Sequence, residues 1–277
     1  MFNIFGFYKF KKLNNLKKLK NRLENNLKDY EIRGTIIISP EGVNGTISDK
    51  KNNLLKFNKL LKKILSIKKF NSENNSNSKF NPFHKLKIKI KKEVVPMGFK
   101  VRNYNFPKNN LNPREWNKII KKKDTVLIDA RKSFEYDVGT FKKSLNPNIE
   151  NFREFPKYLN QFKNSENIAM FCTGGIRCEK ANIYLKKKGF KNVYVLKGGI
   201  INYLNNINKK NSQWNGECFV FDNRVSIKHG LRQGSYSICS GCRKPVSIKE
   251  KKSSKYLEGI HCPNCLLYTS DAADEVV

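Results

Sequence analysis

Acidic residues are scarce in this chain of 277 residues, which has 23 Asp and Glu against 56 Lys and Arg. The formal net charge of +33 attracts polyanions, so RNA, DNA or an anionic membrane surface are the partners that it favours. Lys and Asn are both very abundant, however, as they are when coding sequence drifts towards A and T. The charge therefore fits a nucleic-acid partner and a compositional bias equally well.

Histidine is rare too, with only three in the chain. Neither a haem-attachment motif nor the triad of two histidines and a carboxylate that binds non-haem iron is evident. The sequence also contains no recognisable motif for an organic cofactor. It therefore identifies no group that would activate oxygen.

Long apolar runs and an export signal are lacking as well. No apolar run approaches the length of about 20 residues that spans a membrane. Residues 1–8 are apolar, but basic residues follow rather than precede them, and no small-residue cleavage site comes after. Seven cysteines without an export signal indicate a reducing compartment, in which thiols serve chemistry or metal binding. We therefore expect a cytoplasmic protein without a membrane segment.

Residues 1–100 predict a ferredoxin-like domain with the element order βαββαβ. From the apolar periodicity we expect strands at residues 2–9, 34–39, 43–48 and 86–95 and helices at residues 13–27 and 54–64. The polar residues 71–78 are predicted to form a mobile loop. Asn44 and Gly45 resemble a hairpin turn, because Asn-Gly suits positive φ.

Residues 110–208 predict an α/β domain with a parallel sheet. Short apolar strands are expected at residues 126–129, 168–171 and 193–196, with a helix at 177–188. Functional groups collect at the carboxyl ends of strands in such sheets. Asp129 and Cys172 both follow a predicted strand directly, so we expect them at this edge.

The segment between the second strand and the helix is the strongest candidate active-site loop. Its residues are Cys172, Thr173, Gly174, Gly175, Ile176 and Arg177. The two glycines let successive N–H groups point inward next to the positive end of a helix, which stabilises a thiolate or a persulfide. Arg177 adds a fixed charge and a fork for an anionic group. Cys178 either resolves an oxidised Cys172 by forming a disulfide or simply fills a small space, and the sequence leaves both open.

Residues 215–267 form a small cysteine-rich C-terminal module. Two Cys-x-x-Cys pairs, spaced as in zinc ribbons, are expected to bind a structural Zn²⁺ through Cys239, Cys242, Cys262 and Cys265. The alternative is four free thiols. Residues 268–277 contain neither Lys nor Asn, unlike the rest of the chain, and we expect this tail to be artefactual.

The segments around the loop resemble a rhodanese domain, namely residues 129–136 with Gly139, the loop itself and residues 189–199. More narrowly, residues 172–181 are similar to the signature of the tRNA uridine(34) hydroxylase family, whose members contain a rhodanese domain. Further similar segments are residues 41–48, 92–98, 152–156 and 218–225. The resemblance also makes the glycine-rich segment with Asn44 and Gly45 a candidate for contact with RNA or with another domain. The resemblance covers the chain up to about residue 267.

The resemblance implies an oxidoreductase of the monooxygenase type. Its expected reaction is the O₂-dependent conversion of the wobble uridine of tRNA to 5-hydroxyuridine, with molecular oxygen as co-substrate and the anticodon loop as partner. Cys172, Arg177 and Cys178 are the expected catalytic residues. Cys172 acts either as a persulfide or as a nucleophile that adds to C6 of uracil. The oligomeric state stays open.

The resemblance also implies a supporting scaffold of Asp129, Arg131 and Glu135, in which we expect Arg131 to pair with Glu135. Lysines on the outer faces of the first domain are expected to dock tRNA. The aromatic residues Tyr8, Phe10 and Phe83 lie among these lysines and could stack on splayed bases of the anticodon loop, although we expect each of them to be a core residue first.

Three other functions use the same features. A plain sulfurtransferase would move sulfur through a persulfide on Cys172. A phosphatase of this fold needs a larger loop than the four residues between Cys172 and Arg177, which argues against it. A non-catalytic RNA-binding protein would keep the loop passively, and loss of Cys172 would then change nothing.

Overall fold

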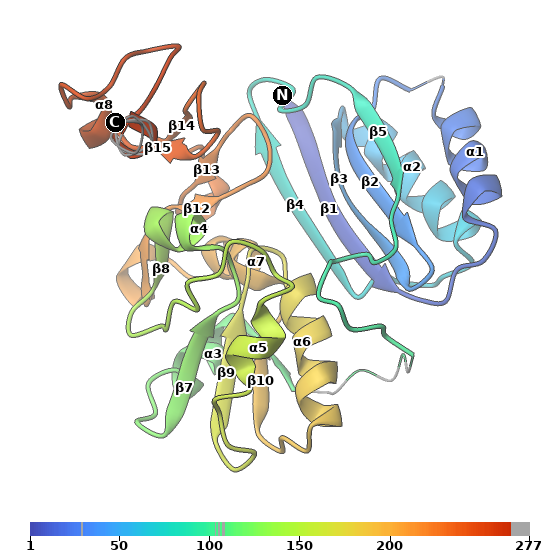
Figure 1. Cartoon of the computed structure of the whole chain (residues 1–277). Coiled ribbons are helices and arrows are strands. Elements are labelled where there is room, and N and C mark those ends of the chain that lie inside the picture. Colours follow the sequence, from blue (N-terminus) through green and yellow to red (C-terminus); the bar gives the residue numbers. More distant parts are fainter. Residues whose placement is uncertain (29, 103, 105, 107–108, 267–277) are drawn as a thin grey trace, which may run out of the picture.

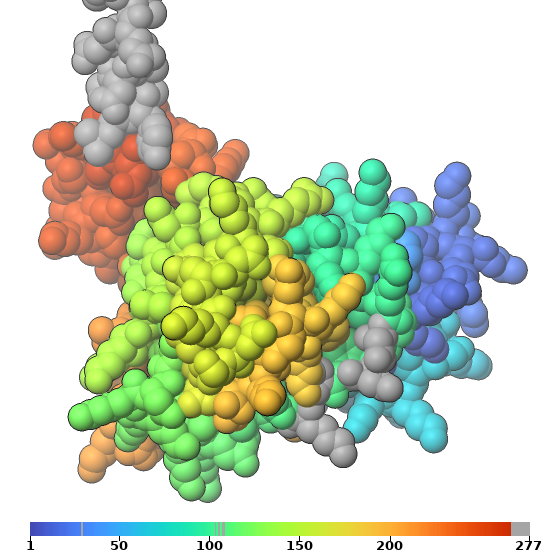
Figure 2. Space-filling view, turned by 60° about the horizontal axis from the view of Figure 1, so that its bottom comes forward, coloured from blue at the N-terminus to red at the C-terminus, as the bar shows by residue number. Residues whose placement is uncertain are grey.

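The computed structural model describes residues 1–28, 30–102, 104, 106 and 109–266, so the tail predicted at residues 268–277 lies outside the described residues. Three parts follow one another along the chain (Figure 1). They are a five-stranded sheet with two helices, a four-stranded parallel sheet with flanking helices, and a set of short hairpins. Figure 2 shows the green and yellow central part between the blue N-terminal part and the red C-terminal module.

The N-terminal part has the predicted ferredoxin-like arrangement, followed by one additional strand. Its elements are β1 (Phe2–Phe10), α1 (Leu16–Leu27), β2 (Arg33–Ser39), β3 (Gly42–Asp49), α2 (Lys51–Ile64), β4 (Ser72–Ser78) and β5 (Leu86–Ile90). The strand order is β4-β1-β3-β2-β5. Neighbouring strands are antiparallel except for β2 and β5, which are parallel.

The prediction of a mobile loop at residues 71–78 was wrong, because Ser72–Ser78 is strand β4. It pairs antiparallel with β1 from Phe2↔Ser78 to Tyr8↔Ser72. The hydrogen bonds between strands join backbone groups and do not depend on the side chains. A strand with only polar side chains can therefore form at a sheet edge if the neighbouring strand carries the apolar side chains that the core needs. The strand β5 was predicted to be the last strand of the βαββαβ unit. It is instead a fifth strand, at the opposite edge of the sheet from β4.

The prediction of a hairpin turn at Asn44-Gly45 was also wrong. Both residues lie inside β3 and pair with β1 and β2, whereas the turn between β2 and β3 falls at Pro40 and Glu41. A Cβ at Gly45 would lie 2.6 Å from Cζ of Phe7. The glycine at this position therefore makes room for an aromatic ring of the neighbouring strand.

Strand β1 of the N-terminal sheet buries side chains on both faces of the sheet. Side chains alternate across a strand, so Phe5 and Phe7 of β1 pack on the face that α1 and α2 cover. Tyr8 and Phe10 point the other way and belong to the core of the central part. Both are almost fully buried, which makes Phe10 core and removes it as an exposed stacking platform.

The central part has the predicted parallel sheet, in the order β6-β10-β9-β7. Its elements are β6 (Asn110–Leu111), α3 (Pro113–Ile119), β7 (Thr125–Asp129), α4 (Ser133–Val138), β8 (Gly139–Phe141), α5 (Phe155–Leu159), β9 (Asn167–Phe171), α6 (Ile176–Lys187), β10 (Val193–Leu196) and α7 (Gly199–Asn206). Helices α5 and α6 pack on one face, and α3 and α7 on the other. Since Asp129 pairs with Phe171, Asp129 and Cys172 lie at the carboxyl ends of adjacent strands, as predicted.

The C-terminal part consists of short elements. They are β11 (Trp214–Gly216), β12 (Cys218–Phe219), β13 (Ser226–Ile227), β14 (Ser237–Ile238), β15 (Pro245–Val246) and α8 (Ile248–Lys251). Two further single turns of 3₁₀ helix lie at Lys209–Asn211 and His229–Leu231. Among the described helices, none combines the length and the apolarity that crossing a membrane requires.

Candidate active site

The loop after β9 holds Cys172 at the carboxyl edge of the parallel sheet. Gly175 has φ +99° and precedes α6, and its N–H donates to Sγ of Cys172 at 3.2 Å. The carbonyl oxygen of Cys172 accepts from the N–H of Ile200 at 3.0 Å, which ties the loop to the start of α7. A Cβ at Gly199 would lie 2.4 Å from that oxygen, so a glycine is needed there. The backbone thus holds the sulfur in one position.

The surroundings of Cys172 favour its thiolate. Burial raises the pKa of Cys172, but it falls to about 6 because of a hydrogen bond from the Cys178 side chain, the charge of Arg177, and the N–H groups of Cys178 and Gly175. The pKa of Cys178 rises well above its ordinary value, because the thiol is buried beside Cys172. Near neutral pH, Cys172 is therefore mostly ionised and Cys178 is a thiol that donates to it.

Two buried ion pairs hold this region, and they differ from the predicted one. Glu135 binds Arg177 through both carboxylate oxygens at 2.8 Å each. Arg131 binds Asp129 instead, with Nε–Oδ1 at 2.8 Å and Nη2–Oδ2 at 2.6 Å. The predicted pairing of Arg131 with Glu135 was wrong, because Arg131 folds back on its own strand end while Glu135 faces the loop. The guanidinium fork of Arg177 is thereby occupied by Glu135, and its charge remains next to Cys172.

Cys172 opens into a cavity of about 290 Å³ that all three parts of the chain line. The loop supplies one wall together with Ile201 of α7. The opposite wall is the face of the N-terminal sheet, where Ile4, Gly6 and Tyr8 of β1 are flanked by residues of β3 and β4. The flanking residues are Asn44, Gly45, Thr46, Asn74 and Ser76. The reactive thiol therefore faces a largely polar surface from another part of the chain.

The third wall comes from the segment after β12, which includes Phe221 and Arg224. Phe221 is 66% exposed, which is unusual for so large an apolar side chain. Arg224 is held by Asp222, with Nε–Oδ1 at 2.8 Å, and by Oγ of Ser76 at 2.9 Å. The sequence analysis did not assign these wall residues to a site. The one feature of the sequence that could have pointed to these residues was the resemblance of residues 218–225 to the family, but no role was expected for that segment.

A fully buried lysine fixes the N-terminal sheet over the loop. Lys180 of α6 donates to Glu41 at 2.6 Å, to Glu93 at 2.7 Å and to the carbonyl oxygen of Val95 at 2.9 Å. Glu41 follows β2, and Glu93 follows β5, so one ammonium joins two segments of the N-terminal part to the helix behind Cys172. This contact ties the N-terminal part to the helix that follows the Cys172 loop.

The four cysteines of the C-terminal module converge, as the spacing predicted. Their sulfur atoms all lie within 4.8 Å of one another. The closest pairs are Cys242–Cys262 at 3.7 Å, Cys239–Cys265 at 3.8 Å and Cys262–Cys265 at 3.9 Å. A tetrahedron with Zn–S bonds of about 2.3 Å has edges of about 3.8 Å, so the donor set fits one Zn²⁺.

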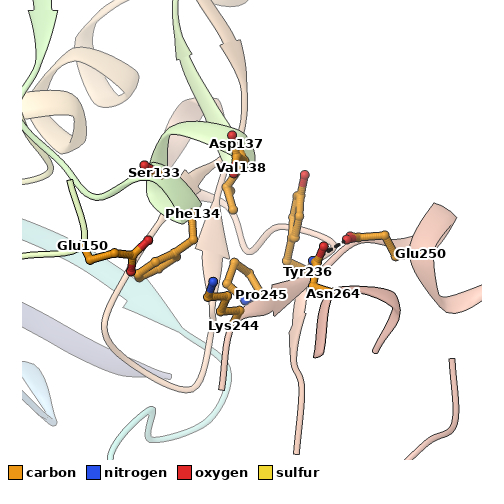
Figure 3. Close-up of a pocket in the computed structure, with 10 residues that line it drawn as sticks. All are labelled: Ser133, Phe134, Asp137, Val138, Glu150, Tyr236, Lys244, Pro245, Glu250 and Asn264. Atoms are coloured by element: carbon orange, nitrogen blue, oxygen red, sulfur yellow. Dashed lines mark hydrogen bonds between the residues drawn. The ribbon is translucent and has the colours of Figure 1, made fainter. Parts of the chain in front are cut away.

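A second cavity, of about 680 Å³, lies between α4 and the C-terminal module (Figure 3). Phe134 and Asp137 of α4 face Tyr236 and Lys244 across it, and Glu250 accepts from Asn264 at 3.2 Å. None of the described residues that line this cavity is a cysteine. We therefore take the smaller cavity at Cys172 as the candidate active site.

Two family profiles and several named proteins match the chain. The profile described as a UPF0176 acylphosphatase like domain matches residues 2–94, and that of the rhodanese-like domain matches residues 112–206. A Pelagibacter ubique protein named tRNA uridine(34) hydroxylase is 65% identical over 265 residues, which are 96% of this chain and 88% of that protein. The chain belongs to the tRNA uridine(34) hydroxylase family. Its resemblance to that family and its predicted fold class are thereby confirmed.

Further members of the family match over nearly the same length. Proteins of this name from Prochlorococcus marinus subsp. pastoris and Teredinibacter turnerae are 44% and 41% identical, over 277 and 264 residues. These matches cover 97% and 94% of this chain and 89% and 82% of the two proteins. The similarity therefore extends over all three parts of the chain, including the walls of the cavity.

Proposed function

We propose that this chain hydroxylates C5 of uridine 34 in tRNA, and that Cys172 is the essential catalytic residue. The proposal is supported by nearly full-length similarity to proteins named tRNA uridine(34) hydroxylase. The observation that carries it is a cysteine with a pKa of about 6 in a nucleoside-sized cavity. In this proposal Arg177 and Cys178 stabilise the thiolate, and Thr173, Gly174, Gly175 and Ile176 shape the loop.

The cavity suits one uridine that has left the stack of the anticodon loop. Ligand pockets run from about 300 to 1,000 Å³, so a volume of about 290 Å³ lies at the small end of this range and suits a single nucleoside. The edge of uracil offers two carbonyl acceptors around one N–H donor. Asn44 and Asn74 carry both donor and acceptor atoms and lie on the wall opposite the thiol. Phe221 at the rim offers a ring on which a splayed base can stack.

A thiolate at this place makes C5 reactive. Addition of sulfur to C6 moves the electrons of the C5=C6 bond towards the C4 carbonyl, and C5 becomes nucleophilic. An electrophilic oxygen derived from O₂ then bonds to C5. Monooxygenase stoichiometry consumes one O₂ and two electrons from a reductant, and it releases one water. Glu135 keeps Arg177 in place, while Asp129 and Arg131 brace the strand end.

We also propose that tRNA is the partner of this protein and that the protein is cytoplasmic. Lys85, Lys87 and Lys89 are exposed along β5, while Ile88 between them is buried, so the alternation of this edge strand presents its charges to the outside. Phosphate groups bind such charges without sequence preference, and the cavity would supply the choice of base.

Nucleoside mass spectrometry of bulk tRNA tests the proposed function. The host lacks its own wobble-uridine hydroxylases and carries either this chain or an empty vector. We expect 5-hydroxyuridine or its derivatives only with the chain. If none forms although the chain is folded and soluble, hydroxylation is excluded. A persulfide on Cys172, detected by tag-switch labelling, would then support sulfur transfer, and tRNA binding without it would support a non-catalytic role.

We also propose that Cys239, Cys242, Cys262 and Cys265 hold one structural Zn²⁺. The sulfur spacing supports this, and among the described residues Val246 is the only fully apolar core residue packed with these cysteines. The module is too small to bury much apolar surface, so a metal would supply stability that its core lacks.

Zinc analysis of the purified chain checks the metal site. We expect about one zinc per chain in the intact protein and almost none in Cys242→Ser, with a lower melting temperature for the variant. Cys218→Ala is the control and should keep its zinc, because Cys218 is buried in a different core cluster. A folded chain with four titratable thiols in the module and no zinc would contradict the proposal.

A further inference from the structure

A tyrosine and a glutamate form a buried pair beside the catalytic loop. Tyr8 comes from the face of β1 that lines the cavity with Cys172, and it is 5% exposed. A Cβ at Gly175 would lie 3.0 Å from its hydroxyl oxygen, so the hydroxyl sits directly over the loop. Burial raises the pKa of Tyr8, and the carboxylate of Glu179 on α6, which lies next to that hydroxyl, raises it further. The N-terminal part thus places one polar atom, the hydroxyl oxygen of Tyr8, next to the catalytic loop.

Glu179 differs from the other buried carboxylates around the site because it has no cationic partner. Asp129, Glu135 and Glu41 each form an ion pair with an arginine or a lysine. Within the described ranges Glu179 makes no ion pair, and its hydrogen-bond donors are the neutral amides of two asparagines. Its Oε2 accepts from Asn71 at 3.1 Å and its Oε1 from Asn110 at 3.2 Å. A carboxylate kept buried without a cation beside a reactive thiol is typical of a group that exchanges protons.

The electrostatics fit a proton acceptor near neutral pH. Burial raises the pKa of Glu179 to about 7, against the hydrogen bonds from Asn110, Tyr8 and Asn71 and the charge of Lys9. Burial also raises the pKa of Tyr8 well above its ordinary value, with further contributions from Glu179, Cys172 and Cys178. The charged or titratable groups that face the pair are therefore Lys9 of β1 and the two cysteines. Tyr8 stays protonated and bridges the cavity to a carboxylate that changes its charge around pH 7.

We propose that Tyr8 and Glu179 relay the proton that leaves C5 of the bound uracil during hydroxylation. This inference rests on the proposed function and deepens it. When C5 carries the new hydroxyl and C6 is still bonded to sulfur, the C5–H bond breaks and its electron pair forms the C5=C6 bond. The C6–S pair returns to sulfur as the Cys172 thiolate. The C5 proton passes to the oxygen of Tyr8, whose own proton moves to Glu179 and from there to solvent. Tyr8 is the catalytic residue of this step, and Glu179 positions and discharges it.

Tyr8→Phe and Glu179→Gln test the relay in the host described above. Each removes one proton-carrying group and keeps the shape of its side chain. We expect 5-hydroxyuridine to fall by a factor of about 100, within the range that general acid–base groups contribute. Since the blocked step releases the base, we also expect a covalent adduct of the chain with tRNA. It would run as a shifted band in denaturing gels, and RNase digestion would leave one nucleotide on Cys172.

The control is Tyr203→Phe, because Tyr203 is a fully buried tyrosine whose hydroxyl donates to Asn117 at 2.7 Å in another core cluster. It should keep hydroxylation and show no adduct. Retained hydroxylation in Tyr8→Phe would overturn the relay, and so would loss of hydroxylation without the adduct. If the unaltered chain forms no 5-hydroxyuridine, the proposed function fails and the relay with it. The two failures are therefore distinguishable.

Discussion

Replacement of Cys172 by alanine is expected to abolish 5-hydroxyuridine at position 34 of tRNA. Among the described residues, Cys172 is the only cysteine that lines the cavity. The carboxylate of Asp222 also lies there, but it is paired with Arg224 and is no nucleophile for C6. Without the thiolate, C6 of uracil has no nucleophile and C5 stays unreactive. Mass spectrometry of bulk tRNA should show the same level as in the host with an empty vector.

Cys218→Ala is the matched control for this result. Cys218 is also fully buried, but burial raises its pKa to about 12, so it stays a thiol, and it does not line the cavity. This variant should hydroxylate normally. If Cys172→Ala hydroxylated as well as the unaltered chain, the central role of Cys172 would be refuted.

The variants Cys172→Ala and Cys218→Ala also allow the pKa of Cys172 to be tested. A low-pKa thiol reacts with iodoacetamide as its thiolate, so the rate should rise with pH around a midpoint near 6, whereas an ordinary thiol reacts near 9. We expect this reaction in Cys218→Ala and in the unaltered chain, and its absence in Cys172→Ala. A midpoint near 9 would mean that Arg177 and the N–H groups do not stabilise the thiolate.

Lys180→Met is expected to destabilise the protein by about 3–5 kcal/mol, the usual cost of removing one partner from a buried ion pair. The substitution leaves the carboxylates of Glu41 and Glu93 without their shared cation, although Met matches the length of the lysine stem. Urea denaturation at pH 7 measures the effect. Lys186→Met lies six residues further along α6 at an exposed position and should change stability by less than about 0.5 kcal/mol.

The destabilisation should depend on pH in a defined direction. Burial raises the pKa of Glu93, but its hydrogen bonds to Lys180 and to the N–H of Met97 hold it below its ordinary value of 4.5. A depressed folded pKa contributes stability above the unfolded pKa and loses it as pH falls through the folded one. The difference between Lys180→Met and the unaltered chain should therefore shrink below about pH 4.5. An equal difference at pH 3 and pH 7 would show that Lys180 acts through packing alone.

Local pattern predicted much of this fold. Apolar periodicity marked β1, β2, β3 and both helices of the N-terminal part, because each of these elements buries one regular face. It failed at β4, where every residue is polar and the strand owes its place to backbone pairing with β1. The local sequence also predicted a turn at Asn44-Gly45, whereas the glycine lies within β3 and makes room for the ring of Phe7 on the neighbouring strand. Both failures concern partners that are distant in sequence.

The cysteine loop and the zinc-type pairs were found from sequence because their chemistry is local. Cys172, its two glycines and Arg177 lie within six residues, and each Cys-x-x-Cys pair is one turn. The partner of Glu135 was predicted to be Arg131, whereas Glu135 binds Arg177, which lies 42 positions away in the chain. The sequence identified Asp129, Arg131 and Glu135 as scaffold residues. Only the tertiary structure shows which side chains they pair with.

The sequence by itself determined the reactive thiol, its loop, the metal-type cysteines and the order of most elements, because neighbours along the chain specify these features. Only the tertiary structure decided that a polar face of the N-terminal sheet closes the cavity over Cys172. It likewise decided that Tyr8 meets Glu179 and that Lys180 meets Glu41 and Glu93. These contacts join residues 87 to 171 positions apart. They depend on the register of two sheets and the docking of one on the other, which no local pattern encodes.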